Sequence, residues 1–170
     1  MSSADTLQTR PLRAAPKLIV DLAQVDLSGQ MLSREDLEKW IPHRDRMALL
    51  DGVIWHTSDF SQGVGLKRVR SDEFWVSGHF PGRPILPGVL MVEAGAQLAS
   101  FLFHGRRNDD SIAGFTRIEN AVFRGQVTPG HDLILLAREV KYQPKRFISD
   151  IQGVVDDRLV FESRITGMVL

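Results

Sequence analysis

Hydrophobic and polar residues are distributed differently in three parts of the chain, and each pattern predicts a different kind of structure. A run from about Pro87 to Phe103 is apolar on every side of a helix, which is typical of a helix that is buried or spans a membrane. Shorter runs around it contain alternating or clustered apolar residues, as strands do. The first thirty residues follow neither pattern.

The apolar run predicts a helix buried inside a folded domain. Pro87 suits the first turn of this helix, because the N–H that proline lacks would have no partner there. A membrane-spanning helix needs about 20 apolar residues. This run is shorter, carries the carboxylate of Glu93 and follows three closely spaced prolines in the middle of the chain. We therefore expect no membrane span.

Two strand-like runs precede the helix and four follow it. They comprise residues 53–56, 63–69, 112–123, 132–142, 147–155 and 158–170. In the last run Leu159, Phe161, Ile165 and Val169 point one way, whereas Glu162, Arg164 and Thr166 point the other. This alternation is typical of a half-buried antiparallel strand. A helix that is apolar on all sides needs a sheet wrapped around it, so the predicted fold class is α+β, with an antiparallel sheet around one long central helix.

Residues 1–30 are predicted to be an N-terminal extension that is flexible, and residues 31–170 a single domain. Within the extension, residues 18–27 are apolar enough to form a short strand or an arm on a neighbouring subunit. A short helix capped by Ser33 is expected next, ending before Pro42.

The composition excludes several classes of function. The chain has no cysteine, which removes disulfides, thiol nucleophiles and cysteine metal sites and fits a cytoplasmic protein. Its 21 Lys and Arg residues are balanced by 21 Asp and Glu residues, which argues against a broad nucleic-acid-binding surface. The five histidines form no zinc-binding pattern, and the chain has neither a phosphate loop nor a dinucleotide fingerprint.

Polar residues interrupt the apolar helix along one stripe, which begins with Glu93 and Gln97 and continues with Ser100 and His104. A carboxyl group in an apolar setting has a raised pKa and keeps its proton. Glu93 is therefore a candidate proton donor, because such donors gather at active sites. The alternative, an exposed helix edge on which Glu93 has no chemical role, stays open at this point.

His79 lies 14 residues before Glu93, directly ahead of a stiff turn rich in proline and glycine. Imidazole titrates near neutral pH and is a suitable base. The turn leads into the start of the helix, where free N–H groups near Gly88 and Val89 can polarise a carbonyl or hold an oxyanion. A base, an acid and an oxyanion site within twenty residues form a coherent catalytic set.

A sequence signature surrounds these residues. It runs over residues 78–90, GHFPGRPILPGVL, and continues with Glu93, Ala94, Ala96 and Gln97. It resembles the signature of the β-hydroxyacyl-acyl carrier protein dehydratases of fatty acid synthesis, of the type with a catalytic glutamate. Weaker similarity extends from about Trp40 to the C-terminus. The resemblance implies the hotdog fold, in which a sheet wraps around one helix.

The resemblance also implies a reaction, the dehydration of a (3R)-3-hydroxyacyl group on acyl carrier protein to the trans-2-enoyl thioester and water. His79 is expected to take the C2 proton and Glu93 to protonate the leaving hydroxyl. The N–H near Gly88 is expected to polarise the thioester carbonyl. Gln97 is expected to orient the carboxyl group of Glu93, or alternatively to cap a buried polar pocket. This elimination needs neither a metal nor an organic cofactor, so none is expected.

Two kinds of partner follow from the resemblance. In this family the His and the Glu come from opposite subunits of a dimer, and dimers often assemble into hexamers as trimers of dimers. Acyl carrier proteins are acidic, so a basic rim is expected to steer them. The candidates are Lys67, Arg68 and Arg70 on one run, and Lys141, Lys145 and Arg146 on another. For each group, ordinary solvated strand edges stay open as the alternative.

Pro42, His43 and Arg44 resemble the opening Pro-His-Arg segment of the same family. The family commonly has an aromatic residue and a proline next, where this chain has Asp45 and Arg46. We therefore favour a solvated loop for His43 and Arg44.

Three other functions remain possible from the sequence. A hotdog thioesterase would use Glu93 beside an attacking water. A dehydratase of another carrier-bound chain, such as a polyketide or aryl polyene intermediate, would keep His79 and Glu93 unchanged. A catalytically silent acyl-binding scaffold is disfavoured because both residues are present.

Overall fold

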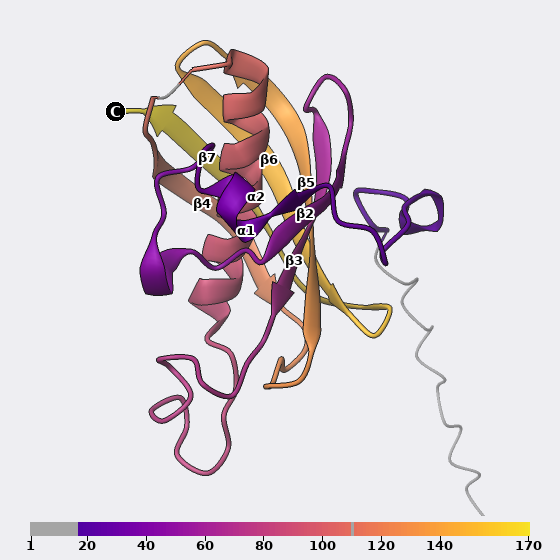
Figure 1. The fold of residues 1–170 in the computed structure, drawn as a ribbon, viewed down its shortest axis with the longest axis vertical. Helices are drawn as coiled ribbons and strands as arrows, with labels where there is room; N and C mark the ends of the chain where they lie inside the picture. Colours follow the sequence, from indigo (N-terminus) through magenta and orange to yellow (C-terminus); the bar gives the residue numbers. More distant parts are fainter. Residues whose placement is uncertain (1–16, 110) are drawn as a thin grey trace, which may run out of the picture.

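A seven-stranded antiparallel sheet carries the long helix α2 along one of its faces (Figure 1). This computed structural model describes residues 17–109 and 111–170. The strand order is β1-β2-β3-β5-β6-β7-β4. The strands are β1 (Leu32–Ser33), β2 (Gly52–His56), β3 (Gln62–Arg68), β4 (Ala113–Phe123), β5 (Asp132–Gln143), β6 (Arg146–Val155) and β7 (Arg158–Val169). The predicted α+β fold class with one long central helix is confirmed, and the six predicted strands appear within one or two residues of their expected bounds.

Helix α2 (Gly88–Arg107) begins one residue later than predicted, because Pro87 is its N-cap and not part of the first turn. It ends at Asn108, whose left-handed backbone (φ 54°) and N–H bond to the His104 carbonyl are typical of a helix C-terminus. Its residues from Met91 to His104 are buried, with Glu93 as the half-buried exception. In the first turn, the expectation of burial on every side is wrong for Val89, which is 73% exposed.

Glycines let the helix and the sheet approach closely. A Cβ at Gly63 of β3 would lie 3.0 Å from the side chain of Leu102, and a Cβ at Gly95 of α2 would lie 2.9 Å from Ile151 of β6. Contacts this short are not tolerated by other residues without movement of their neighbours. Gly95 therefore faces the sheet.

The short helix α1 (Arg34–Leu37) forms where the sequence predicted it. Ser33 accepts a hydrogen bond from the Asp36 N–H, and the Asp36 carboxylate accepts one from the Ser33 N–H, so both sides of a capping box are present. Two single 3₁₀ turns complete the helical elements, η1 (Leu22–Gln24) and η2 (Asp45–Met47).

The described part of the N-terminal extension packs on the face of the sheet opposite α2 (Figure 1). The Ile19 N–H donates to Gln152 Oε1 (2.9 Å), and Gln152 Nε2 donates to the Lys17 carbonyl (3.2 Å). Val20 is buried there among sheet residues that include Val64 and Leu136. From residue 17 onward, the expectation of a flexible extension is therefore wrong. The arm lies on its own sheet and forms no strand before residue 32, whereas residues 1–16 lie outside the described residues.

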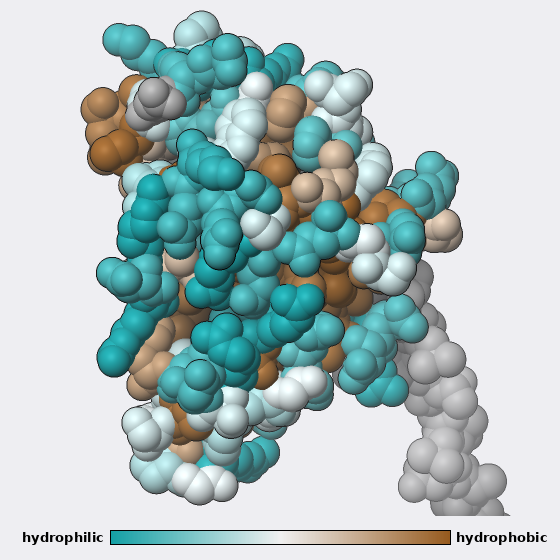
Figure 2. Space-filling model, viewed as in Figure 1, coloured by the Kyte–Doolittle hydropathy of each residue, from teal (hydrophilic) through white to brown (hydrophobic). Residues whose placement is uncertain are grey.

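The two edges of the sheet differ in length and polarity. The β1 edge is two residues long, whereas the β4 edge is 11 residues long. Exposed apolar side chains lie along or beside the β4 edge: Ile112, Phe115, Ile118, Val122, Phe123 and Leu170. In Figure 2 hydrophobic atoms gather at the upper left, where Figure 1 places the C-terminus, and further hydrophobic atoms show between hydrophilic side chains in the centre and right of the view. A long apolar edge strand is a template for pairing with another chain.

None of the helices in the described residues combines the length and hydrophobicity needed to cross a membrane.

Candidate active site

Glu93 and Gln97 lie together on α2, as their spacing predicted. Gln97 Nε2 donates to Glu93 Oε1 at 2.9 Å. His43, from the loop before β2, also reaches this carboxylate, with its Nε2 3.3 Å from Glu93 Oε1. The Glu93 side chain is 19% exposed, so the carboxylate is mostly shielded but still accessible.

Gln97 is fixed in one orientation by its own partners. It is 1% exposed, and its Oε1 accepts the Leu49 N–H at 3.0 Å. Because an N–H must face the amide oxygen, the amide nitrogen must face the other way, where it donates to the Met47 carbonyl (2.7 Å) and to Glu93. Gln97 therefore ties Glu93 to the segment that leads into β2.

The two oxygens of Glu93 have different surroundings. Both neighbours, His43 and Gln97, contact Oε1. Within residues 17–109 and 111–170, no hydrogen-bond partner of Oε2 is found. Glu93 borders a cavity of about 120 Å³. The cavity is lined by His43, Glu93, Ala96, Gln97, Ser100, Ala113, Gly114, Phe115 and Phe147. Oε2 is therefore the oxygen available to a molecule bound there.

The sequence analysis expected a raised pKa and a protonated Glu93, but the structure favours a lowered pKa. Burial raises the pKa of Glu93, as the sequence argument assumed, but hydrogen bonds from His43 and Gln97 outweigh it and hold the pKa below its ordinary value. The expectation of a proton kept by apolar surroundings is therefore wrong, because the carboxylate has two polar partners. One of them, His43, lies 50 residues away in sequence.

His43 is also a correction to the sequence analysis. Its side chain is 25% exposed and lines the Glu93 cavity, so it does not lie in a solvated loop. Arg44 holds this loop in shape by donating to the carbonyls of Glu38 (2.6 Å) and Ile41 (2.8 Å). The Pro-His-Arg segment was the signal that pointed to His43.

His79 is held by the loop between β3 and α2. Its N–H donates to the Trp75 carbonyl (2.8 Å), and its own carbonyl accepts the Ile85 N–H (2.8 Å). The imidazole Nδ1 lies 2.7 Å from the Ile85 carbonyl. Because a carbonyl only accepts hydrogen bonds, Nδ1 must carry the hydrogen, which leaves Nε2 as the basic nitrogen. The ring stacks on Phe80, with 4.1 Å between centroids, and the His79–Phe80 peptide bond is cis.

The structure does not bring His79 and Glu93 together within one chain. No hydrogen bond or ion pair joins them in the described residues, and His79 is not among the residues that line the Glu93 cavity. The described contacts therefore do not join the two side chains into one site.

The start of α2 presents two free amides. In the part of the chain that the structure describes, neither the Gly88 nor the Val89 N–H donates a hydrogen bond, as expected for the first turn of a helix. The ring of Phe123 lies so close to Gly88 that a Cβ there would be 2.7 Å from it. Glycine at this position therefore lets β4 pack against the helix start.

One of the two predicted basic groups does not fit the predicted role in docking acyl carrier protein. Lys67 is 1% exposed and forms an ion pair with Glu73, so the prediction that it docks a carrier protein is wrong. Arg70 is engaged with Asp72 (3.0 Å) and Asp51 (3.6 Å). Arg68 remains exposed. The other group, Lys141, Lys145 and Arg146, is exposed at the β5–β6 turn and forms no ion pair with the described residues.

Two relatives show what this chain is similar to in sequence. A relative from Ralstonia nicotianae, named 3-hydroxyacyl-[acyl-carrier-protein] dehydratase FabZ, is 36% identical over 129 residues, or 74% of this chain and 78% of the relative. A relative of the same name from Alkaliphilus metalliredigens is 42% identical over 105 residues, or 61% of this chain and 71% of the relative.

Solved structures support the fold at lower sequence identity. The dehydratase heterocomplex ApeI:P from Xenorhabdus doucetiae matches with a TM-score of 0.69 at 17% identity, over 79% of this chain and 90% of the compared chain. The TT0310 protein from Thermus thermophilus matches with a TM-score of 0.56 at 18% identity, over 75% of this chain and all of the compared chain. These matches confirm the predicted hotdog fold. At this level of identity they are evidence for the fold alone.

The family model of the FabA-like domain matches residues 41–164, from just before His43 to the middle of β7. This range contains every residue of the site described above. The chain therefore belongs to the FabA-like domain family.

Proposed function

We propose that this chain is a 3-hydroxyacyl-[acyl-carrier-protein] dehydratase, a hydro-lyase of fatty acid biosynthesis. It converts a (3R)-3-hydroxyacyl thioester on acyl carrier protein into the trans-2-enoyl thioester and water. One observation carries the proposal: Glu93 projects from α2 with Oε2 free beside a cavity, in a chain whose signature loop leaves Nε2 of His79 free as a base. The sequence similarity to relatives named as dehydratases supports it.

The reaction divides between two side chains. His79 Nε2 takes the C2 proton, and the electron pair of that C–H bond forms the new C2–C3 double bond. The C3–O bond breaks, and Glu93 Oε2 gives its proton to the leaving hydroxyl, which departs as water. The amides of Gly88 and Val89 stabilise the negative charge that develops on the thioester oxygen. Gln97 and His43 hold the carboxyl group so that Oε2 faces the substrate.

Glu93 must carry a proton for this direction of the reaction, although its pKa in the free chain is lowered. An acyl chain that fills the cavity excludes water from Oε2. Loss of that water strengthens the burial effect, which already raises the pKa of Glu93. Binding of the substrate therefore raises the pKa of Glu93 and favours its protonated form.

A second copy of the chain completes the site. We infer that two copies pair through β4, whose apolar side chains are exposed along the unpaired edge of the sheet. His79 of one copy then acts with Glu93 of the other. Assembly of such dimers into a hexamer, as a trimer of dimers, extends the same proposal.

Acyl carrier protein is the proposed macromolecular partner. Because Lys67 is buried, the docking surface is assigned to the exposed residues of the other basic group, Lys141, Lys145 and Arg146. These residues lie at one end of the sheet, where an acidic protein can be attracted without breaking an existing ion pair.

The test is an absorbance assay at the enoyl thioester band with a 3-hydroxyacyl-acyl carrier protein. The wild type is compared with His79→Ala and Glu93→Gln. Formation of the enoyl product by the wild type, with large losses in both variants, is the expected result. Release of free thiol without enoyl product would instead identify a thioesterase. Turnover only with polyketide-like chains would move the substrate outside fatty acid biosynthesis, and binding without any turnover would leave an acyl-binding scaffold.

A further inference from the structure

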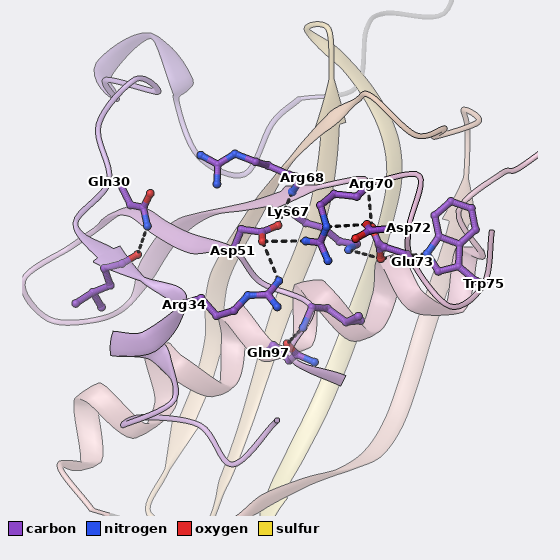
Figure 3. Close-up of polar contacts among 12 residues, drawn as sticks. Gln30, Arg34, Asp51, Lys67, Arg68, Arg70, Asp72, Glu73, Trp75 and Gln97 are labelled. Carbon is purple, nitrogen blue, oxygen red and sulfur yellow. Dashed lines mark hydrogen bonds and ion pairs between the residues drawn. The ribbon is translucent and has the colours of Figure 1, made fainter. Parts of the chain in front are cut away.

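A buried ion pair lies beneath the loop that carries His79. Lys67, near the end of β3, is among the largest fully buried side chains of the described residues, at 1% exposure. Its Nζ donates to Glu73 Oε2 at 2.8 Å, and the Glu73 side chain is itself 7% exposed. Figure 3 shows the pair below the start of the loop, with Trp75 on the far side of Glu73.

The Glu73 carboxylate is the centre of this cluster because it accepts three hydrogen bonds. Lys67 Nζ and the indole Nε1 of Trp75 (3.1 Å) bind Oε2, and the Arg70 N–H (2.9 Å) binds Oε1. Burial raises the pKa of Glu73, but the hydrogen bonds from Lys67 and from the Arg70 N–H outweigh burial and keep it below the ordinary value. The carboxylate is therefore charged, and its position is set from three directions.

Stability alone does not account for such a pair. Removing two charges from water costs several kcal/mol per ion, and an apolar pair of similar volume is often equally stable or more stable. A charged pair with three directed donors differs from an apolar pair in one respect, which is that it defines a single geometry.

The contacts lead from Glu73 to His79 through Trp75. The Trp75 side chain, in a residue that is 4% exposed, is fixed by core packing and by its hydrogen bond to Glu73. The Trp75 carbonyl accepts the N–H of Gly78 (3.1 Å) and the N–H of His79 (2.8 Å). In the described residues no hydrogen bond or ion pair joins Glu73 or Lys67 to His79 directly, so the pair acts on His79 through Trp75.

The other end of the loop is held differently. Ile85 binds His79 through its N–H and its carbonyl, and the Leu86 N–H donates to the Val127 carbonyl at 2.7 Å. The bonds from the Ile85 N–H and the Leu86 N–H join backbone atoms, and the third bond involves only the imidazole of His79 itself, so none of them depends on the side chains of Ile85 or Leu86. The upstream anchor at Glu73 depends on specific side chains, and substitutions can therefore remove it selectively.

We propose that Glu73, held by Lys67, is a positioning residue for His79 and sets where the imidazole Nε2 lies relative to the substrate. The role of His79 as the base rests on the proposed function. The position of the His79 loop does not, so it can be measured independently of turnover.

The first experiment compares the wild type with the double variant Lys67→Met/Glu73→Leu, which removes both charges and leaves no buried charge unpaired. The matched control is Arg164→Met/Asp150→Leu, which removes an ion pair (2.7 Å) on the outer face of the sheet. Thermal unfolding and oligomeric mass establish that each protein is folded. We expect kcat of the Lys67/Glu73 variant to fall roughly 10- to 100-fold with KM changed less than about threefold, since a misplacement near 1 Å has an effect of this size. A folded variant with unchanged kcat, or an equal loss in the control, would overturn the proposal.

The second measurement does not need enzymatic activity. Diethyl pyrocarbonate modifies accessible imidazoles, and mass spectrometry follows its rate at His79 with His131 as the internal reference. We expect a several-fold change at His79 in the Lys67/Glu73 variant and none in the control. If the wild type turns over no thioester, the proposed function fails, and this labelling rate still decides whether the pair positions His79.

Glu73→Gln covers the case in which the double variant does not fold. It keeps the shape of the side chain and an acceptor for Trp75 but removes the charge beside Lys67. Hydrogen exchange is expected to accelerate in residues 76–86 while β6 and β7 keep their protection. Unchanged exchange in residues 76–86, or equal acceleration throughout the chain, argues for a merely structural pair and against the proposal.

Discussion

Glu93 and His79 are held in place by different means. Glu93 projects from the interior of a 20-residue helix, and its two polar partners act directly on its carboxylate. His79 lies in an irregular loop, where backbone hydrogen bonds hold the residue and a buried ion pair lies two contacts away. A helix needs little help to position a side chain, whereas a loop needs anchors at both ends. The two halves of the proposed site should therefore respond differently to mutation.

The largest effect is expected from removing the reacting groups themselves. His79→Ala and Glu93→Gln should each lower kcat by roughly 10²- to 10⁴-fold, the usual contribution of general acid–base catalysis. Both variants should unfold close to the wild-type temperature, because neither leaves a buried charge unpaired. The enoyl absorbance assay and thermal unfolding measure the two effects.

Mixing these two inactive variants tests whether His79 and Glu93 of one site come from different copies of the chain. If each site takes His79 from one copy and Glu93 from the other, a mixed dimer contains one intact site and one doubly defective site. Co-expression of His79→Ala with Glu93→Gln should therefore restore a substantial part of the activity. No recovery, in a preparation shown by mass spectrometry to contain mixed dimers, would place both residues of each site in one chain.

Gln97→Leu is expected to lower both the stability of the protein and its catalytic rate. It leaves the buried Leu49 N–H and the partly buried Met47 carbonyl without their partner, and a buried unsatisfied group costs about 1 to 3 kcal/mol. Urea unfolding should show this loss of stability together with a reduced kcat. As a contrast, Gln62→Leu at the start of β3, where the side chain forms no hydrogen bond with the described residues, should leave both quantities nearly unchanged.

His43→Asn should change the pH dependence more than the maximal rate. His43 helps to lower the pKa of Glu93, so its removal raises that pKa. Since Glu93 acts as an acid, dehydration declines as pH rises through its pKa, and this decline should move to higher pH. A profile of kcat/KM against pH measures the shift. His56→Asn is the control, because His56 stacks on Phe60 away from the cavity. A shift to lower pH would contradict the assignment.

The same pKa has a consequence for stability. Because the pKa of Glu93 is lower in the folded chain than in the unfolded chain, its ionised form favours the folded state above the unfolded-state pKa. This contribution is lost as pH falls through the folded-state pKa.

The smallest effect is expected outside both halves of the site. Lys145→Glu/Arg146→Glu reverses two exposed charges that contact no described acid. KM for an acyl carrier protein substrate should rise several-fold at low ionic strength and return toward the wild-type value as salt screens the charges. KM for a small thioester that lacks the carrier protein should not change, and an equal rise for both substrates would show that the two residues affect catalysis instead of docking.

The sequence by itself determined the elements whose cause is local. Helix α2 follows from a continuous apolar run after a proline, and Glu93 meets Gln97 because residues four apart share a helix face. The strands follow from alternation and turn residues, and the signature around His79 identified the family. Each of these inferences depends on neighbours within a few residues, which a single sequence displays.

Only the tertiary structure decided which distant residues meet. It placed His43 against Glu93, which reversed the expected pKa shift, and it gave Lys67 a partner that allows a lysine to be buried. It also laid the N-terminal arm on its own sheet through Gln152. The physical reason is the same in each case: burial and charge depend on strand register and packing between segments far apart in sequence, whereas periodicity reports only the local backbone and the face on which a side chain lies.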